Sequence, residues 1–131
     1  MNVRREERAA AWLARAHDDL DFARSAAETV SYLARFHCQQ ASGKALKAVI
    51  TSRSGDAPVV HDARRLLEAL TALAAPASPE VAEAANSLDK YYVGPRYPDA
   101  IDFADARLLY GPREARRGIE DAELVLRWCD E

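Results

Sequence analysis

The chain has 131 residues, of which 49% are hydrophobic and 8% aromatic, and its formal net charge at pH 7 is -3. This length predicts one domain, 1–131, that buries about two thirds of its unfolded surface without a disulfide or a metal. The negative charge argues against a protein that coats nucleic acid through overall basicity. Cys38 and Cys129 are too few and too far apart for a zinc site, so no metal and no cofactor are expected.

The N-terminal residues lack the apolar core of a signal peptide, and no apolar run approaches the roughly 20 residues that cross a bilayer. We therefore expect a cytoplasmic protein with no membrane span. The many alanines, without clusters of β-branched residues, favour helices over strands.

The first half of the chain predicts three helices. Apolar residues that include Trp12 and Leu20 recur at steps of three and four over 4–29, which is typical of a long amphipathic helix. A second helix is predicted over 32–52 and stops in the segment SRSGDAP, because glycine and proline break helices. A third helix begins near His61 and Asp62 and is closed by Pro76.

The second half predicts two more helices around a long connection. Ser78 and Pro79 are typical of a helix start, with a serine cap and a proline in the first turn. The segment 93–112 is rich in glycine and proline and predicts a long excursion with one short helix over 103–109. A last helix starts near Pro112. The whole pattern predicts an all-α fold, an antiparallel up-and-down bundle of four to five helices.

A row of polar residues follows the second helix. His37, Gln40, Lys44 and Lys47 are spaced three, four and three apart and therefore share one face of the helix. Because nearly all other positions are apolar or small, we expect this basic row to be the only face of the helix that meets water. It is either a solvated edge or an anion site, in which the lysines and His37 hold a phosphate and Gln40 gives direction.

Three further residues lie on the enclosed side of that helix. Gln39 and Ser42 need hydrogen-bond partners there, since an unpaired buried amide costs about 1–3 kcal/mol. Gly43 costs about 1 kcal/mol relative to alanine inside a helix, which predicts close approach of another backbone.

Three segments in order, FHCQQASGKALKA, HDARRLL and YYVGPRYPD, resemble the HEPN family (higher eukaryotes and prokaryotes nucleotide-binding). The resemblance extends from about Trp12 to Trp128. It implies a helical up-and-down bundle, commonly a homodimer, and often a partner protein that is a minimal nucleotidyltransferase, the two being regarded as a toxin–antitoxin pair.

Two departures from the family pattern change what the resemblance implies. Gly43 stands where the family commonly has glutamate, so any role of that acid is absent. The ribonuclease signature, an arginine followed by four to six residues and a histidine, is also absent, because no arginine in this chain has that spacing to His17, His37 or His61. Metal-free RNA cleavage therefore does not carry over. The resemblance implies a non-ribonuclease member that binds a nucleotide, RNA or a protein partner.

The third segment places Arg96, Tyr97 and Asp99 between or beside two prolines, Pro95 and Pro98, which restrict the backbone. An arginine fork suits phosphate and a tyrosine ring can stack on a base, so these residues are candidates for the ligand site. The structural alternative is that Arg96 pairs with Asp99 or another acid while Tyr97 plugs one end of the bundle.

Two further groups complete the candidates. His37 is the best placed histidine for acid or base chemistry, but it needs a second group from the Arg96 segment or from a dimer mate. Leu124 and Trp128 are four residues apart and off the main apolar stripe of the last helix, which predicts a homodimer interface.

We therefore expect a nucleotide- or RNA-binding protein that is not an enzyme. One alternative is a composite ribonuclease in which His37 or His61 of one subunit meets Arg96 of another. A second alternative is a scaffold without a ligand that docks a partner through Leu124 and Trp128.

Overall fold

The computed structural model of the chain describes residues 3–91 and 110–131. Its helices are α1 (Val3–Ala26), α2 (Ser31–Ser54), α3 (Ala63–Ala72), α4 (Pro79–Leu88), the short 3-10 helix η1 (Asp89–Tyr91) and α6 (Pro112–Asp130). Within these ranges there is no strand, and the predicted all-α class is confirmed. The short helix expected over 103–109 lies outside the described residues.

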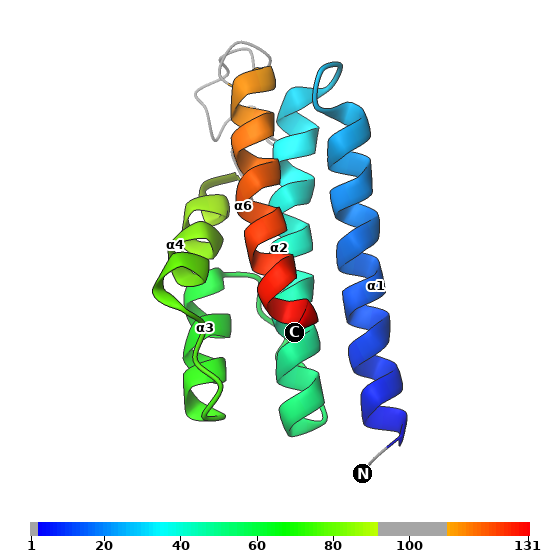
Figure 1. The fold of residues 1–131 in the computed structure, drawn as a ribbon, viewed down its shortest axis with the longest axis vertical. Coiled ribbons are helices and arrows are strands. Elements are labelled where there is room, and N and C mark those ends of the chain that lie inside the picture. Colours follow the sequence, from blue (N-terminus) through cyan, green and yellow to red (C-terminus); the bar gives the residue numbers. More distant parts are fainter. Residues whose placement is uncertain (1–2, 92–109) are drawn as a thin grey trace.

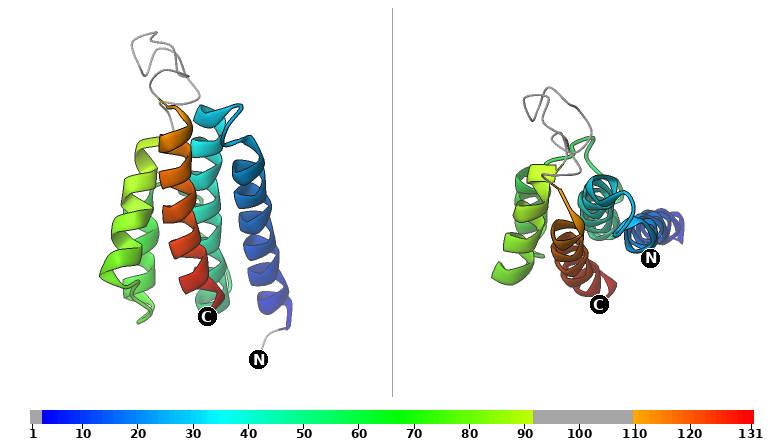
Figure 2. Two further views of the ribbon diagram at one scale, coloured as in Figure 1. Left: turned by 45° about the horizontal axis from the view of Figure 1, so that its top comes forward. Right: turned by 90° about the horizontal axis from the view of Figure 1, so that it is seen from above.

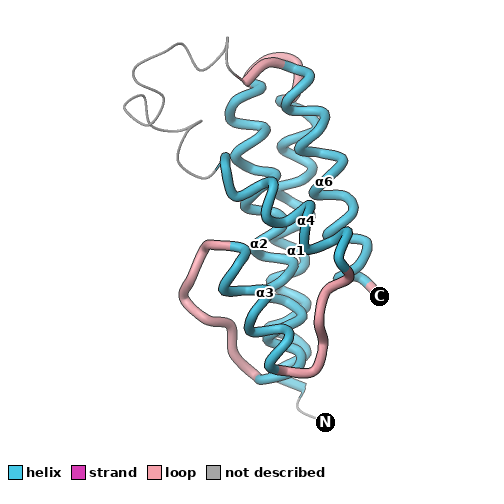
Figure 3. The backbone as a smooth tube through the Cα atoms, turned by 90° about the vertical axis from the view of Figure 1, so that its left-hand side faces the viewer, coloured by secondary structure: helices cyan, strands magenta, loops and turns pink. Residues whose placement is uncertain are grey.

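The helices form an up-and-down bundle with α2 at its centre (Figure 1). In this view α1 runs upward, α2 runs downward beside it, and α6 also runs downward, next to α2. The two short helices α3 and α4 together take the place of a fourth long helix in the bundle. α4 lies above α3, as Figures 1 and 3 show. Seen from above, α1 lies on one side of the bundle and α3 and α4 lie on the other, with α2 and α6 between them (Figure 2). α2 contacts α1, α3, α4 and α6.

Local signals fix the ends of the helices. Asp62 accepts a hydrogen bond from the backbone N–H of Arg65 at the start of α3, and the Ser78 hydroxyl does the same for Val81 in α4. Gly55 ends α2 with a left-handed φ of 95°, a conformation that residues with a Cβ rarely adopt. These caps explain why the predicted boundaries are close to the observed ones.

The core consists mainly of alanine and leucine from all five α-helices of the described residues. Small side chains let α2 lie close to its neighbours, so most of its surface is buried. Gln39 and Ser42 are both only 3% exposed, as expected for the enclosed side. Gly43 differs from expectation, because among the described residues a Cβ there would meet only Leu66 Cδ1, at 3.9 Å, and no backbone atom of another described element within 4 Å.

None of the helices in the described ranges combines the length and the apolar character that crossing a membrane requires.

Candidate functional site

The polar row of α2 is less exposed than its sequence suggests. His37 and Lys44 are partly buried beside α1, and Lys47 is only 8% exposed. The expectation that the row forms a continuous wet face is therefore wrong at Lys47. The cause is α1, which packs along this side of α2 and covers it.

Asp19 of α1 joins two residues of the row. Its Oδ1 lies 3.1 Å from His37 Nδ1 and its Oδ2 lies 2.6 Å from Lys44 Nζ. Because an ionised carboxylate only accepts, Nδ1–H of His37 is the donor. Burial by itself would raise the pKa of Asp19, but the hydrogen bonds and charges of His37 and Lys44 outweigh burial and hold the pKa below its usual 3.8.

Sequence reasoning missed Asp19 as a partner of the basic row. In the sequence, Asp19 lies in an acidic run with Asp18 and Asp21, which is typical of a solvated helix face. One signal was present, because Asp19 is three residues after Ala16 and four before Ala23, on the apolar side of α1. An acid on a buried face needs a cationic partner on the facing helix.

Lys47 has a different environment from Lys44. Its Nζ lies 5.1 Å from the centre of the Trp12 ring, a cation–π contact. Among residues 3–91 and 110–131 no carboxylate or carbonyl accepts a hydrogen bond from this ammonium, although the residue is nine-tenths buried. Burial, with the charge of Lys44 adding to it, lowers the pKa of Lys47. Lys47 is thus a largely buried residue whose ammonium faces open space and has no anionic partner among the described residues.

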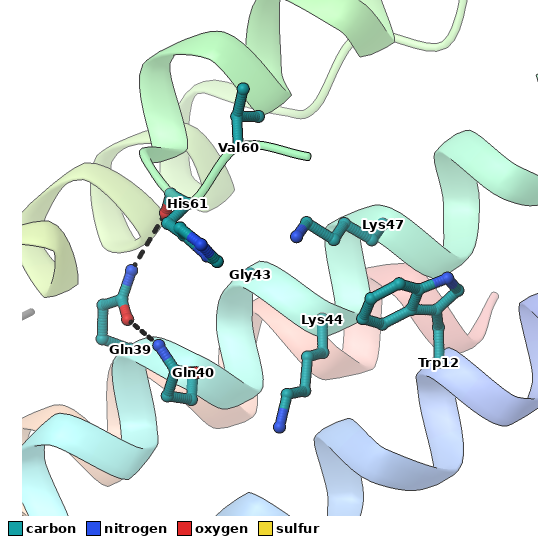
Figure 4. A pocket seen from close by; sticks show the side chains of 8 residues that line it. All are labelled: Trp12, Gln39, Gln40, Gly43, Lys44, Lys47, Val60 and His61. Atoms are coloured by element: carbon teal, nitrogen blue, oxygen red, sulfur yellow. Dashed lines mark hydrogen bonds between the residues drawn. The ribbon is translucent and has the colours of Figure 1, made fainter. Parts of the chain in front are cut away.

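The ammonium of Lys47 points into a pocket between α1, α2 and the segment before α3 (Figure 4). We call it the Lys47 pocket. Its volume is about 180 Å³, and it is lined by Trp12, Gln39, Gln40, Gly43, Lys44, Lys47, Val60 and His61. In Figure 4 the His61 ring also points into this space, opposite Lys47. No acidic side chain is among the lining residues.

A hydrogen-bond chain fixes the rim of the pocket. Gln40 Nε2 donates to Gln39 Oε1 over 2.8 Å, and Gln39 Nε2 donates to the carbonyl of His61 and to Asp89 Oδ1. Asp89 Oδ2 in turn accepts from the backbone N–H of Ala63, at the start of α3. The partners that Gln39 was expected to need are therefore present, and they tie α2 to the His61 segment.

The structure brings only some of the expected site residues together. Gln40, Lys44 and Lys47 line one pocket, whereas His37 lies farther along α2, beside Phe22 and Phe36. Trp12 and His61 belong to the pocket and were not expected there. Trp12 looked like a core residue from its place in the apolar stripe of α1.

Other expected residues lie away from this pocket or outside the described ranges. Arg96, Tyr97 and Asp99 belong to the segment 92–109, which the structure does not describe. Leu124 and Trp128 are partly buried and pack against the core from the outer side of α6.

Two kinds of chemistry find no support in the described residues. No group of three or more His, Cys, Asp or Glu side chains in 3–91 and 110–131 is arranged to hold a metal ion. Burial raises the pKa of the thiol to about 12 at both Cys38 and Cys129, so neither forms a nucleophilic thiolate near neutral pH.

A comparison with protein families settles the lineage of this bundle. The model of the HEPN domain matches residues 9–131. The chain belongs to the HEPN family. Two solved structures share its fold. TT1696 from Thermus thermophilus has a TM-score of 0.82 and 32% identity over 94% of this chain and 96% of the other. ST0689, an archaeal HEPN homologue, has a TM-score of 0.73 and 28% identity over 93% and 94%. None of the curated proteins matches.

Proposed function

We propose that this HEPN protein binds a phosphate-bearing ligand, a nucleotide or RNA, in the Lys47 pocket. One observation carries the proposal, namely that Lys47 is only 8% exposed while its ammonium faces the pocket and has no anionic partner among the described residues. A cation that is partly shielded from water and has no counter-charge favours an anion, and a phosphate would supply that partner. Lys44 and His61 add positive or hydrogen-bonding groups at the rim, and Gln40 would orient the ligand.

Three further parts of the proposal rest on the family resemblance. We propose that Arg96, Tyr97 and Asp99 belong to the same ligand site, where Arg96 contacts a phosphate and Tyr97 stacks on a base. The protein would act as a homodimer, with Leu124 and Trp128 at the interface. A minimal nucleotidyltransferase would be its partner in a toxin–antitoxin pair.

Calorimetric titration with AMP, GMP, CMP and UMP, and with the four nucleosides, tests the binding proposal. At least one monophosphate should bind, and its nucleoside should bind at least tenfold more weakly, because the charged contact to phosphate contributes about 1.5–3 kcal/mol. Lys47→Met should remove this preference. Lys90→Met, which makes the same change at an exposed lysine that does not line the pocket, is the matched control.

The proposal fails if no monophosphate binds, or if Lys90→Met weakens binding as much as Lys47→Met. The pH dependence is a second readout. Because burial lowers the pKa of Lys47, its charge is lost at a lower pH than that of an exposed lysine. Affinity for the monophosphate should therefore decline as the pH rises toward the ordinary lysine pKa of 10.5.

A composite ribonuclease is the second candidate, and one observation favours it. Asp19 accepts from Nδ1 of His37, which orients the ring and leaves Nε2 to take up a proton. Incubation of an RNA pool with the wild type and with His37→Ala tests this function. Cleavage that the substitution abolishes would establish it, whereas an intact RNA pool, or cleavage that persists in the variant, would rule it out.

A further inference from the structure

A second hollow adjoins the Lys47 pocket on the outer side of α1. It has a volume of about 360 Å³ and is lined by Arg8, Ala11, Trp12, Arg15 and Lys44. Trp12 and Lys44 line both spaces, so the two are neighbours that share a wall. Arg8, Trp12 and Arg15 are four and three residues apart and lie on one face of the helix. We call this the Arg15 hollow.

The sizes of the two spaces favour a ligand that is longer than one nucleotide. Sites for small molecules usually measure about 300–1,000 Å³, so the Lys47 pocket, at about 180 Å³, has room for little more than a phosphate and its sugar. The Arg15 hollow, at about 360 Å³, falls within that range. A ligand that fills both spaces continues past the first phosphate.

The positive charges are spread in a way that suits more than one phosphate. Arg8 and Arg15 are seven residues apart, which is about 10 Å along the helix axis, farther than one phosphate group extends. Arg8 donates to the carbonyl of Gly55, a neutral acceptor, so this contact brings no negative charge to offset the guanidinium. Arg15 is exposed and has no acceptor in the described part of the chain. No acidic residue from 3–91 or 110–131 lines the hollow, and Asp19, the nearby acid on α1, is already bound to Lys44 and His37.

Trp12 supplies an aromatic ring next to these positive charges. Proteins that bind single-stranded nucleic acid combine a cationic track along the backbone with aromatic rings on which bases stack. Here one indole lies between the buried Lys47 and the two arginines. A duplex would keep its bases paired and away from this ring.

We infer that the Lys47 pocket and the Arg15 hollow form one track for a single-stranded oligonucleotide of at least two nucleotides. A phosphate lies at Lys47, a base stacks on Trp12, and the next phosphate lies at Arg15, with Arg8 placed to contact a phosphate beyond it. This inference rests on the proposed function, because it places the first phosphate in the same pocket.

Calorimetric titration with UMP, pUpU and pUpUpU tests the inference, since stacking on an aromatic ring tolerates any base. Affinity should rise at least tenfold from UMP to pUpUpU. The slope of log affinity against log salt should steepen by about 0.7 for each added phosphate that is contacted. Oligo(dT) of the same lengths shows whether the sugar matters, and tripolyphosphate shows whether charge alone suffices.

Two arginine variants locate the track. Arg15→Gln should lower affinity for pUpUpU by about tenfold and leave UMP unchanged, because UMP does not reach the hollow. Arg127→Gln makes the same change at an exposed arginine of α6 that lines neither space, and it should leave both ligands unchanged. Lys47→Met should weaken both ligands.

The outcomes separate the inference from the proposed function. If UMP binds in a manner that depends on Lys47 while affinity does not grow with length, only the track is refuted. The track is also refuted if Arg127→Gln acts like Arg15→Gln, or if tripolyphosphate binds as tightly as pUpUpU. If neither UMP nor the oligonucleotides bind, the proposed function and the track fail together.

Discussion

Replacement of Lys47 by methionine should separate binding from stability. Methionine keeps the length and most of the apolar surface of lysine but removes the ammonium. In the ligand-free protein, that ammonium is partly desolvated and lacks an acceptor among the described residues, so we expect Lys47→Met to stabilise the fold while it abolishes binding. The same replacement at Lys44 should act in the opposite direction, because Lys44 is paired with Asp19 at 2.6 Å.

The contacts give the expected magnitudes. Relief of the partial desolvation of this charge contributes at most about 1–3 kcal/mol, and loss of the cation–π contact with Trp12 costs about 0.5–1 kcal/mol. The free energy of unfolding of Lys47→Met should therefore increase by roughly 0.5–2 kcal/mol. Lys44→Met leaves Asp19, 14% exposed, with His37 as its remaining partner and should lower the free energy of unfolding by about 1–2 kcal/mol.

Urea unfolding followed by circular dichroism measures both effects, and thermal unfolding gives a second estimate. For 131 residues, 1 kcal/mol corresponds to a change in Tm of about 3–4 °C, so the two variants should melt on opposite sides of the wild type. Lys90→Met should melt with the wild type. If Lys47→Met is destabilised as much as Lys44→Met, then Lys47 is a structural residue and the reasoning from its missing partner is wrong.

Four other substitutions or treatments have definite expected outcomes. Asp19→Asn should be less stable than the wild type at pH 7, and the difference should shrink as the pH falls below about 4, because a carboxyl with a lowered pKa loses its contribution when it is protonated; urea unfolding from pH 7 to pH 3 measures this. Gly118→Ala should destabilise by about 1–3 kcal/mol in urea unfolding, because the new Cβ would lie 2.7 Å from Cδ of the buried Arg35. Ala74→Gly should stabilise by about 0.5–1 kcal/mol, since Ala74 has a φ of 58°, and a lower urea midpoint would contradict this. Cys38 should resist iodoacetamide at pH 8 until the protein unfolds, as mass spectrometry would show.

The fold could be predicted because its signals are local. Caps such as Asp62 and Ser78 and the breaker Gly55 act on their own turns, so the sequence places helix ends without knowledge of the neighbours. The same reliance on local signals gave a wrong expectation at Gly43. A glycine within a helix indicates a need for space, but which atoms fill that space depends on the packing, and here Leu66 is the one described side chain that comes near.

The site was harder to predict because it depends on how α1 lies against α2. Helical spacing correctly placed Gln40, Lys44 and Lys47 on one face. It could not show that α1 covers part of that face, that Asp19 binds Lys44 across 25 residues of sequence, or that Trp12 forms a pocket wall. These facts depend on the relative rotation and offset of two helices, which no local pattern encodes.

The left-handed turn that ends α2 also positions Arg8, one of the two arginines of the proposed track. Gly55 allows the chain to turn there, and its carbonyl then receives the guanidinium of Arg8, so the shape of one turn decides where an arginine on another helix rests. A side chain at this position would strain the turn and would also crowd Arg5, whose Nε lies 3.3 Å from the place a Cβ would occupy. A change at Gly55 would thus move Arg8 within the proposed track and alter the preference for longer oligonucleotides that the track predicts.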